Sequence, residues 1–182
     1  MSTTTEPFTE HEILALRRLV DVSAIQEVML RYCRCADRND PELMKTIFWD
    51  EGTDNHGMYS GTAKGFFERA YANRDLLTAR YHIIGTPRVQ FVDNSQAKVE
   101  TYFHYVGVFV GERGEETFGT SGGRYRDVFE RRDGEWRVLR RLTIFDWSLA
   151  TPYQPGWDFF EIPEGINRGT VEPGDATYST DW

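Results

Sequence analysis

A chain of 182 residues is long enough for one well-stocked hydrophobic core and short for two. Its formal net charge of −8 argues against a nucleic-acid or anionic-membrane surface, because such surfaces need clustered Lys and Arg. No run approaches the roughly 20 apolar residues of a membrane helix, and no secretory signal opens the sequence. We therefore expect a cytoplasmic protein without nucleic-acid or membrane partners.

Aromatic residues make up 14% of the chain, and a surplus of large rings in a small protein lines either a core or a pocket. For any single ring, core packing is the first interpretation. The two cysteines, Cys33 and Cys35, lie two positions apart on a predicted helix, so they point about 200° away from each other and do not pair. Two reduced, buried thiols are expected.

Helices are predicted in the first half of the chain. Thr9, with Glu12 three residues later, forms a capping-box pattern at the start of a short helix. Asp21 or Ser23 is expected to cap a second, longer helix, which carries an apolar stripe at helical spacing and runs to Asp37. The carboxylate of Asp37 therefore falls near the last helical turn.

Asp40 followed by Pro41 then predicts a new helix, with an N-cap aspartate and proline at the first position. A strand and a turn follow. Ser60 or Thr62 is expected to begin another helix, over residues 63–79.

The second half of the chain changes to strands, which are dense in β-branched and aromatic residues. Asp133-Gly134 is a strong signal for a hairpin turn between two of them. Helices followed by several antiparallel strands indicate the α+β class. A strongly curved antiparallel sheet folded over the N-terminal helices would make a cone-shaped α+β barrel, whose open mouth leads to an apolar pocket.

Three parts of the chain are expected. Residues 1–8 form a flexible arm, residues 9–149 form the cone domain, and residues 150–182 form an extended tail. The tail holds much of the chain's Pro and Gly, with several aromatic residues and no sustained periodicity. We expect it to dock on the body of the protein or on a neighbouring subunit.

Three motifs carry a resemblance to a known family. They are a helix end with the pattern Y-x-x-x-x-D at Tyr32 and Asp37, a strand start H-x-x-G-T-P at His82, and a hairpin YRDVFERRDGEWRV over residues 125–138. Together they resemble the SnoaL-like branch of the nuclear transport factor 2-like superfamily. That branch is similar to scytalone dehydratase, hexachlorocyclohexane dehydrochlorinase and bile-acid 7α-dehydratase. The resemblance covers residues 20–148.

The resemblance implies a lyase that needs no cofactor. In such lyases a histidine removes a carbon-bound proton and an aspartate on the first long helix orients that histidine, which assigns these roles to His82 and Asp37. Tyr32 matches a helix tyrosine of the bile-acid enzyme. Arg141 matches an arginine of the dehydrochlorinase that assists the leaving group.

One position departs from that pattern. The second histidine of the bile-acid enzyme falls near Gly85 in this chain. Its role is therefore empty, or it is served by His104 or His56.

The general chemistry of a histidine–aspartate pair supports these roles for His82 and Asp37, and each residue also has a purely structural interpretation. A buried carboxylate that accepts from one imidazole nitrogen fixes the tautomer and stabilises the imidazolium formed during proton transfer. The alternatives are a helix-end carboxylate on backbone amides for Asp37, a structural histidine for His82 and core packing for Tyr32. Of the strand neighbours Arg140 and Arg141, one points inward and needs an acidic partner or an anionic ligand.

Further side chains are expected to contact a substrate: Tyr59, His104, Trp49, Phe48 and Phe103. A metal site is not expected, because His11-Glu12 lacks the second histidine of a metalloprotease helix and the two cysteines have no companions. No phosphate loop or dinucleotide fingerprint follows a predicted strand.

The sequence thus favours a dehydratase, or a C–C lyase that releases formaldehyde from a lignin-type diaryl compound. Its substrate would be a hydrophobic aromatic or polycyclic small molecule. A ketosteroid-isomerase-like isomerase and a non-catalytic hydrophobic ligand-binding domain stay open, since fold does not imply function. The exposed face of a curved sheet needs cover, so a homo-oligomer is expected, with a trimer favoured over a dimer.

Overall fold

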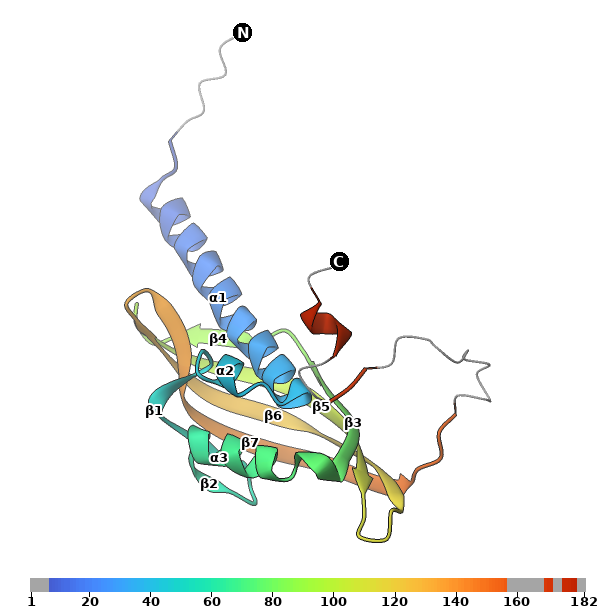
Figure 1. The fold of residues 1–182 in the computed structure, drawn as a ribbon. Helices are drawn as coiled ribbons and strands as arrows, with labels where there is room; N and C mark the ends of the chain where they lie inside the picture. The colour runs from blue at the N-terminus through green and yellow to red at the C-terminus, as the bar shows by residue number, and fades with distance from the viewer. Residues whose placement is uncertain (1–6, 157–168, 172–174, 180–182) are drawn as a thin grey trace.

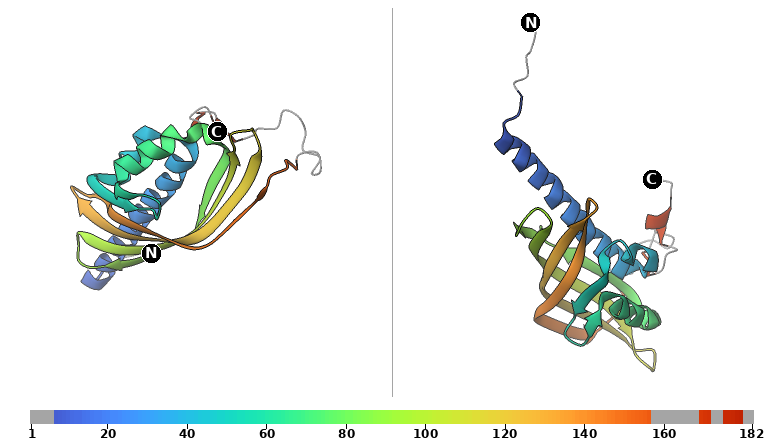
Figure 2. Two further views of the ribbon diagram at one scale, coloured as in Figure 1. Left: turned by 90° about the horizontal axis from the view of Figure 1, so that it is seen from below. Right: turned by 90° about the vertical axis from the view of Figure 1, so that its left-hand side faces the viewer.

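The computed structural model describes residues 7–156, 169–171 and 175–179. Its helices pack on one face of a curved seven-stranded sheet, which makes the α+β cone expected from the sequence (Figures 1 and 2). The helices are α1 (Glu10–Arg38), α2 (Pro41–Met44) and α3 (Ala63–Ala72), with short 3-10 turns at Arg74–Leu76 and Ala176–Tyr178. The strands are β1 (Phe48–Asn55), β2 (Ser60–Thr62), β3 (Leu77–Ile84), β4 (Arg88–Phe91), β5 (Gln96–Val110), β6 (Glu116–Arg132) and β7 (Glu135–Pro152).

The sheet is mixed, which corrects the expectation of a purely antiparallel one. Its strand order is β2-β1-β7-β6-β5-β3, with β4 paired to β5 off this path. The pairing of β1 with β7 is parallel, while every other pairing is antiparallel. The order puts β1 and β3 on opposite sides of the three long central strands, with α1 and α3 lying across the concave face (Figure 2).

The N-terminal helix is continuous, where the sequence predicted two helices. Thr9 caps it, and the reciprocal capping box with Glu12 is confirmed. Asp21 does not cap a second helix, because its carboxylate accepts from Trp136 Nε1 at 2.9 Å and from Arg131 Nη1 at 3.1 Å. The Asp21 carboxylate, which the local sequence pattern assigned to a helix start, is thus hydrogen-bonded to residues of distant strands.

The end of α1 and the turn after it follow the predicted signals. Asn39 ends the helix in the left-handed conformation, at φ 50°. Asp40 then caps α2, whose first residue is Pro41, and Thr62 caps α3. These caps fix where α1 ends, so that its last turn, with Asp37, lies next to β3.

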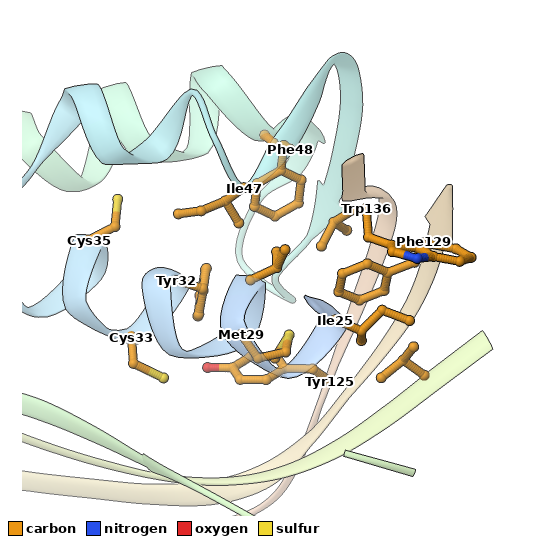
Figure 3. Packing of buried hydrophobic residues seen from close by; sticks show 14 of the residues in the cluster. Ile25, Met29, Tyr32, Cys33, Cys35, Ile47, Phe48, Tyr125, Phe129 and Trp136 are labelled. Atoms are coloured by element: carbon orange, nitrogen blue, oxygen red, sulfur yellow. The ribbon is translucent and has the colours of Figure 1, made fainter. Parts of the chain in front are cut away.

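The apolar stripe of α1 packs against β6 and β7 to form the core (Figure 3). Ile25 and Met29 on the helix are fully buried, as are Phe129 on β6 and Val138 on β7. Burial of a side chain of this size stabilises the fold by about 1.5–3 kcal/mol. The core fills one end of the space under the helices and leaves the other end, around Tyr32, for a cavity.

The hairpin between β6 and β7 turns at Asp133 and Gly134, as predicted. Both residues have positive φ, 50° and 89°. Two successive positive φ values are the signature of the tight turn that matches strand twist. The turn sets the register of the long ladder that carries Asp127 opposite Arg141.

The expected tail begins within β7, which runs to Pro152, and its described residues 169–171 and 175–179 lie against the end of α1. Hydrogen bonds and an ion pair join the two: Asn39 Nδ2 to the Val171 carbonyl at 2.7 Å, Arg34 Nη2 to the Thr177 carbonyl at 2.9 Å, Tyr178 Oη to Asp40 at 3.0 Å, and Arg38 to Asp175 at 3.5 Å. The Arg34 guanidinium also lies 4.5 Å from the centroid of the Tyr178 ring. The expected flexible arm and most of the tail lie outside the described residues. Among the described residues, no helix is long and apolar enough to cross a membrane.

Replacing Asp21 with Ala should lower the free energy of unfolding by about 1–3 kcal/mol, because Trp136 Nε1 then has no acceptor in the core. Urea denaturation followed by tryptophan fluorescence measures this loss. Arg131→Ala is the matched control, since it removes the more exposed partner of the same carboxylate and should cost about 0.5 kcal/mol or less. Equal losses in the two variants would contradict this assignment.

Candidate active site

A cavity of about 560 Å³ opens between the helices and the inner face of the sheet. This volume suits a small organic molecule. Aromatic rings are frequent in its wall, among them Phe66 and Phe67 on α3, Phe103 and Tyr105 on β5, Tyr125 on β6, and Phe145 on β7. Such a wall favours a ligand that is itself largely apolar or aromatic.

The predicted partners Asp37 and His82 meet at this cavity. His82 Nδ1 lies 2.6 Å from Asp37 Oδ1, and the His82 backbone amide donates to Asp37 Oδ2 at 2.9 Å. Because a carboxylate only accepts, Nδ1 carries the proton, and Nε2 is the nitrogen left for a ligand. Since both carboxylate oxygens are engaged, neither the ring nor the carboxylate is free to turn.

Two tyrosines form the base of the cavity next to this pair. The Tyr32 ring lies 5.9 Å from the His82 ring and 5.4 Å from the Tyr125 ring, centroid to centroid. Burial raises the pKa of Tyr32 and that of Tyr125 well above the ordinary value. Both phenols therefore stay protonated. A hydrogen bond between the two hydroxyls lowers the pKa of Tyr32 and raises that of Tyr125, so Tyr125 donates to Tyr32, and Tyr32 keeps its own O–H for the cavity.

Arg141 lies behind these tyrosines, which corrects the expectation that it contacts a leaving group. Its side chain is wholly buried and makes a double hydrogen bond to Asp127, with both N–O distances at 2.8 Å. Its guanidinium also lies 4.0 Å from the Tyr32 ring centroid and 4.2 Å from that of Tyr125. Although burial acts against it, the Asp127 carboxylate holds the pKa of Arg141 well above its usual range. Arg141 therefore lies behind the tyrosine rings and is not among the residues that line the cavity.

Of the two histidines left open by the sequence, His56 lines the cavity and His104 does not. His56 Nδ1 lies 3.2 Å from Asp54 Oδ1, and its ring stacks on Phe66 at 4.3 Å. His104 is exposed on the outer face of the sheet, where its Nε2 lies 2.7 Å from the Thr120 hydroxyl. The expected contact between His104 and a substrate thus does not fit a substrate bound in this cavity.

The other predicted contact residues divide in the same way. Phe103 lines the cavity, stacked on Tyr125. Phe48 is a core residue, and Trp49 donates from Nε1 to the Glu130 carbonyl at the far end of the sheet. Tyr59 donates to the Thr62 carbonyl at the start of α3. Phe48, Trp49 and Tyr59 thus lie off the cavity wall, because local packing and backbone acceptors hold them elsewhere.

Several wall residues were missed from the sequence, and Arg80 is the clearest. It is buried, and its Nη2 donates to Asn39 Oδ1. Among the described residues, its Nε has no hydrogen-bond partner. Burial lowers the pKa of Arg80, with Tyr105 and Asp37 opposing that shift. The missed signal was spacing, since Arg80 stands two residues before His82 on one strand and therefore shares its face.

Comparison with protein families identifies the chain. The model of the SnoaL-like domain matches residues 17–142, so the protein belongs to the SnoaL-like family, within the nuclear transport factor 2-like superfamily. None of the curated proteins compared with this sequence matches it. The resemblance drawn from the helix end, the strand start and the hairpin is confirmed.

Solved structures share the fold at low sequence identity. The hexachlorocyclohexane dehydrochlorinase LinA-type3 from Novosphingobium barchaimii is 18% identical, with a TM-score of 0.66 over 78% of this chain and 99% of that one. A scytalone dehydratase candidate from Novosphingobium aromaticivorans is 21% identical, with a TM-score of 0.62 over 87% and 97%. A Kribbella flavida protein is 17% identical, with a TM-score of 0.65 over 72% and 95%. Similarity at this level shows the fold alone.

Both thiols should resist modification in the folded protein. Burial raises the pKa of Cys33 and that of Cys35 to about 12, so almost no thiolate forms at mildly alkaline pH. Ellman's reagent should label the native protein far more slowly than the same protein in guanidinium chloride. Rapid labelling of both thiols in the native state would contradict this burial.

Proposed function

We propose that the protein is a cofactor-independent lyase in which His82, oriented by Asp37, removes a proton from a hydrophobic small molecule. The observation that carries this proposal is the 2.6 Å contact between His82 Nδ1 and Asp37 Oδ1 at the wall of an aromatic cavity. A positioned base of this kind accelerates proton transfer by about 10²–10⁴-fold. The family and the fold shared with dehydrochlorinases support an elimination.

The elimination needs few groups. His82 Nε2 takes the proton, the C–H electron pair becomes the second bond of an alkene, and the leaving group departs with its own pair. Asp37 stabilises the imidazolium that forms on His82. Tyr32, protonated and adjacent to the His82 ring, donates a hydrogen bond to developing negative charge.

The proposed substrate is a largely aromatic molecule with one polar group. The ring-lined wall and the volume of about 560 Å³ support this choice. Loss of water is the leading reaction. Release of formaldehyde and water from a lignin-type diaryl propanediol uses the same base, which then removes the hydroxyl proton while the C–C electron pair forms the alkene.

Three compounds test the reaction class: a β-hydroxy ketone bearing a phenyl ring, hexachlorocyclohexane and a diaryl propanediol. Ultraviolet absorbance, chloride release and a formaldehyde assay follow the products. For whichever compound reacts, His82→Gln and Asp37→Asn should each lower kcat by about 10²–10⁴-fold. His11→Gln is the matched control, because His11 is exposed at the outer end of α1.

If turnover persists in both His82→Gln and Asp37→Asn, His82 held by Asp37 is not the base. Solvent deuterium in a product of unchanged composition would instead favour an isomerase.

We also propose that the chain works in the cytoplasm as a homo-oligomer, and we favour a trimer over a dimer. The outer face of the sheet supports the oligomer. About half of the surface of four large apolar side chains is exposed there: Tyr81 and Ile83 on β3, Tyr102 on β5 and Trp147 on β7. An exposed apolar patch of this kind is characteristic of an interface.

Sedimentation analysis tests the oligomer. The unmodified chain should sediment as an oligomer, and Tyr102→Glu should shift it toward the monomer, because the interface would then bury an unpaired charge. A control change on the same strand at exposed Lys98, to Glu, should leave the assembly unchanged. A wild-type monomer would rule the oligomer out.

A further inference from the structure

The cavity holds a second imidazole–carboxylate pair besides Asp37 and His82. His56 Nδ1 lies 3.2 Å from Asp54 Oδ1 and 3.4 Å from Oδ2. Asp54 is 1% exposed, and its side chain is fully buried. A carboxylate so placed is costly unless it is paired. Arg141 lies in register with Asp54 on the neighbouring strand but makes its double hydrogen bond to Asp127, so the imidazolium of His56 would supply the second positive charge for the two carboxylates.

The local backbone holds this pair rigidly. Asp54 lies in β1, in register with Arg141 of β7, so its side chain points to the inner face. His56 follows the end of the strand, and its amide donates to the Tyr59 carbonyl at 2.7 Å, across the turn at Gly57. Stacking on Phe66, at an interplanar angle of 20°, fixes the ring.

His56 and His82 face the same cavity from opposite sides. His82 comes from β3 and His56 from the end of β1, which are separated in the sheet by β7, β6 and β5. Each ring directs Nδ1 to its aspartate, and at His56 the Thr143 hydroxyl also lies 3.1 Å from Nδ1. Within the described part of the chain, neither Nε2 has a hydrogen-bond partner. A molecule in the cavity can therefore meet one Nε2 at each side, across Tyr32 and Tyr125.

We infer that His56, held by Asp54, is the general acid that protonates the departing hydroxyl group while His82 takes the proton from carbon. This inference rests on the proposed lyase function. Hydroxide is a poor leaving group and needs a proton as it departs, and an imidazolium is well suited to supply it near neutral pH. The tyrosines are weaker acids, because burial raises their pKa further.

The step balances. His82 Nε2 accepts the carbon-bound proton, and the C–H electron pair forms the alkene. The C–O bond breaks with its pair on oxygen, and His56 Nε2–H protonates that oxygen to give water. His82 ends as imidazolium and His56 as neutral imidazole, and exchange of protons with solvent restores both. Asp54 acts through His56 as a positioning residue, since it fixes the tautomer and stabilises the charged ring.

A pair of probes separates the acid from the base. A phenyl-bearing β-hydroxy ketone loses water, and its β-chloro counterpart loses chloride, which needs no proton; both give the same enone, followed by absorbance. His56→Gln should lower kcat for water loss by about 10²-fold or more and leave chloride loss nearly unchanged. His82→Gln should abolish both reactions, and His11→Gln should change neither.

The outcomes distinguish the two proposals. If His56→Gln leaves water loss intact, or lowers both reactions equally in a folded protein, His56 is not the acid, while the lyase function stands. If His82→Gln retains both reactions, the proposed function fails. A wild-type protein that eliminates from neither compound contradicts that function as well, and the inference falls with it.

Asp54→Asn tests the positioning role. At one pH near neutrality, the imidazole ¹⁵N shifts of His56 should move from those of the imidazolium toward those of the neutral ring, because the Asp54 carboxylate no longer stabilises the charge. Water loss should fall while chloride loss persists. Unchanged ¹⁵N shifts, or equal loss of both reactions, would show that Asp54 does not act through His56.

Discussion

The bond between Asp37 and His82 is the interaction on which the site depends. It joins the last turn of α1 to β3, and it uses one carboxylate oxygen for the imidazole and the other for the backbone amide. The strand and the side chain are thus fixed by the same group. Asn39 caps the end of the helix two residues after Asp37, so the helix stops where the Asp37 carboxylate reaches the strand.

A second buried interaction lies behind the cavity wall. Arg141 and Asp127 make a fully buried ion pair behind the rings of Tyr32 and Tyr125. Such a pair is expensive to desolvate and is weak evidence for stability. The position of the pair explains its presence better, because a fixed cation against both tyrosine rings holds the base of the cavity in one arrangement.

Local signals in the sequence predicted local structure, and distant contacts decided the rest. The turn at Asp133 and Gly134 is set by its own backbone, so it could be read directly. Asp21 looked like a helix cap, yet a tryptophan on β7 takes its carboxylate. Phe103 and His104 were both expected at the substrate, although consecutive strand residues face opposite sides. Only packing settles which of the two faces inward.

The central claim is that His82 removes a carbon-bound proton, and deuterium exchange tests it without any leaving group. A phenyl-bearing ketone that lacks the hydroxyl can be followed in D₂O by the loss of its α-proton NMR signal. The wild-type protein should accelerate this exchange, and with His82→Gln the ketone should exchange at the rate seen in buffer alone. Equal exchange by the two proteins would contradict it.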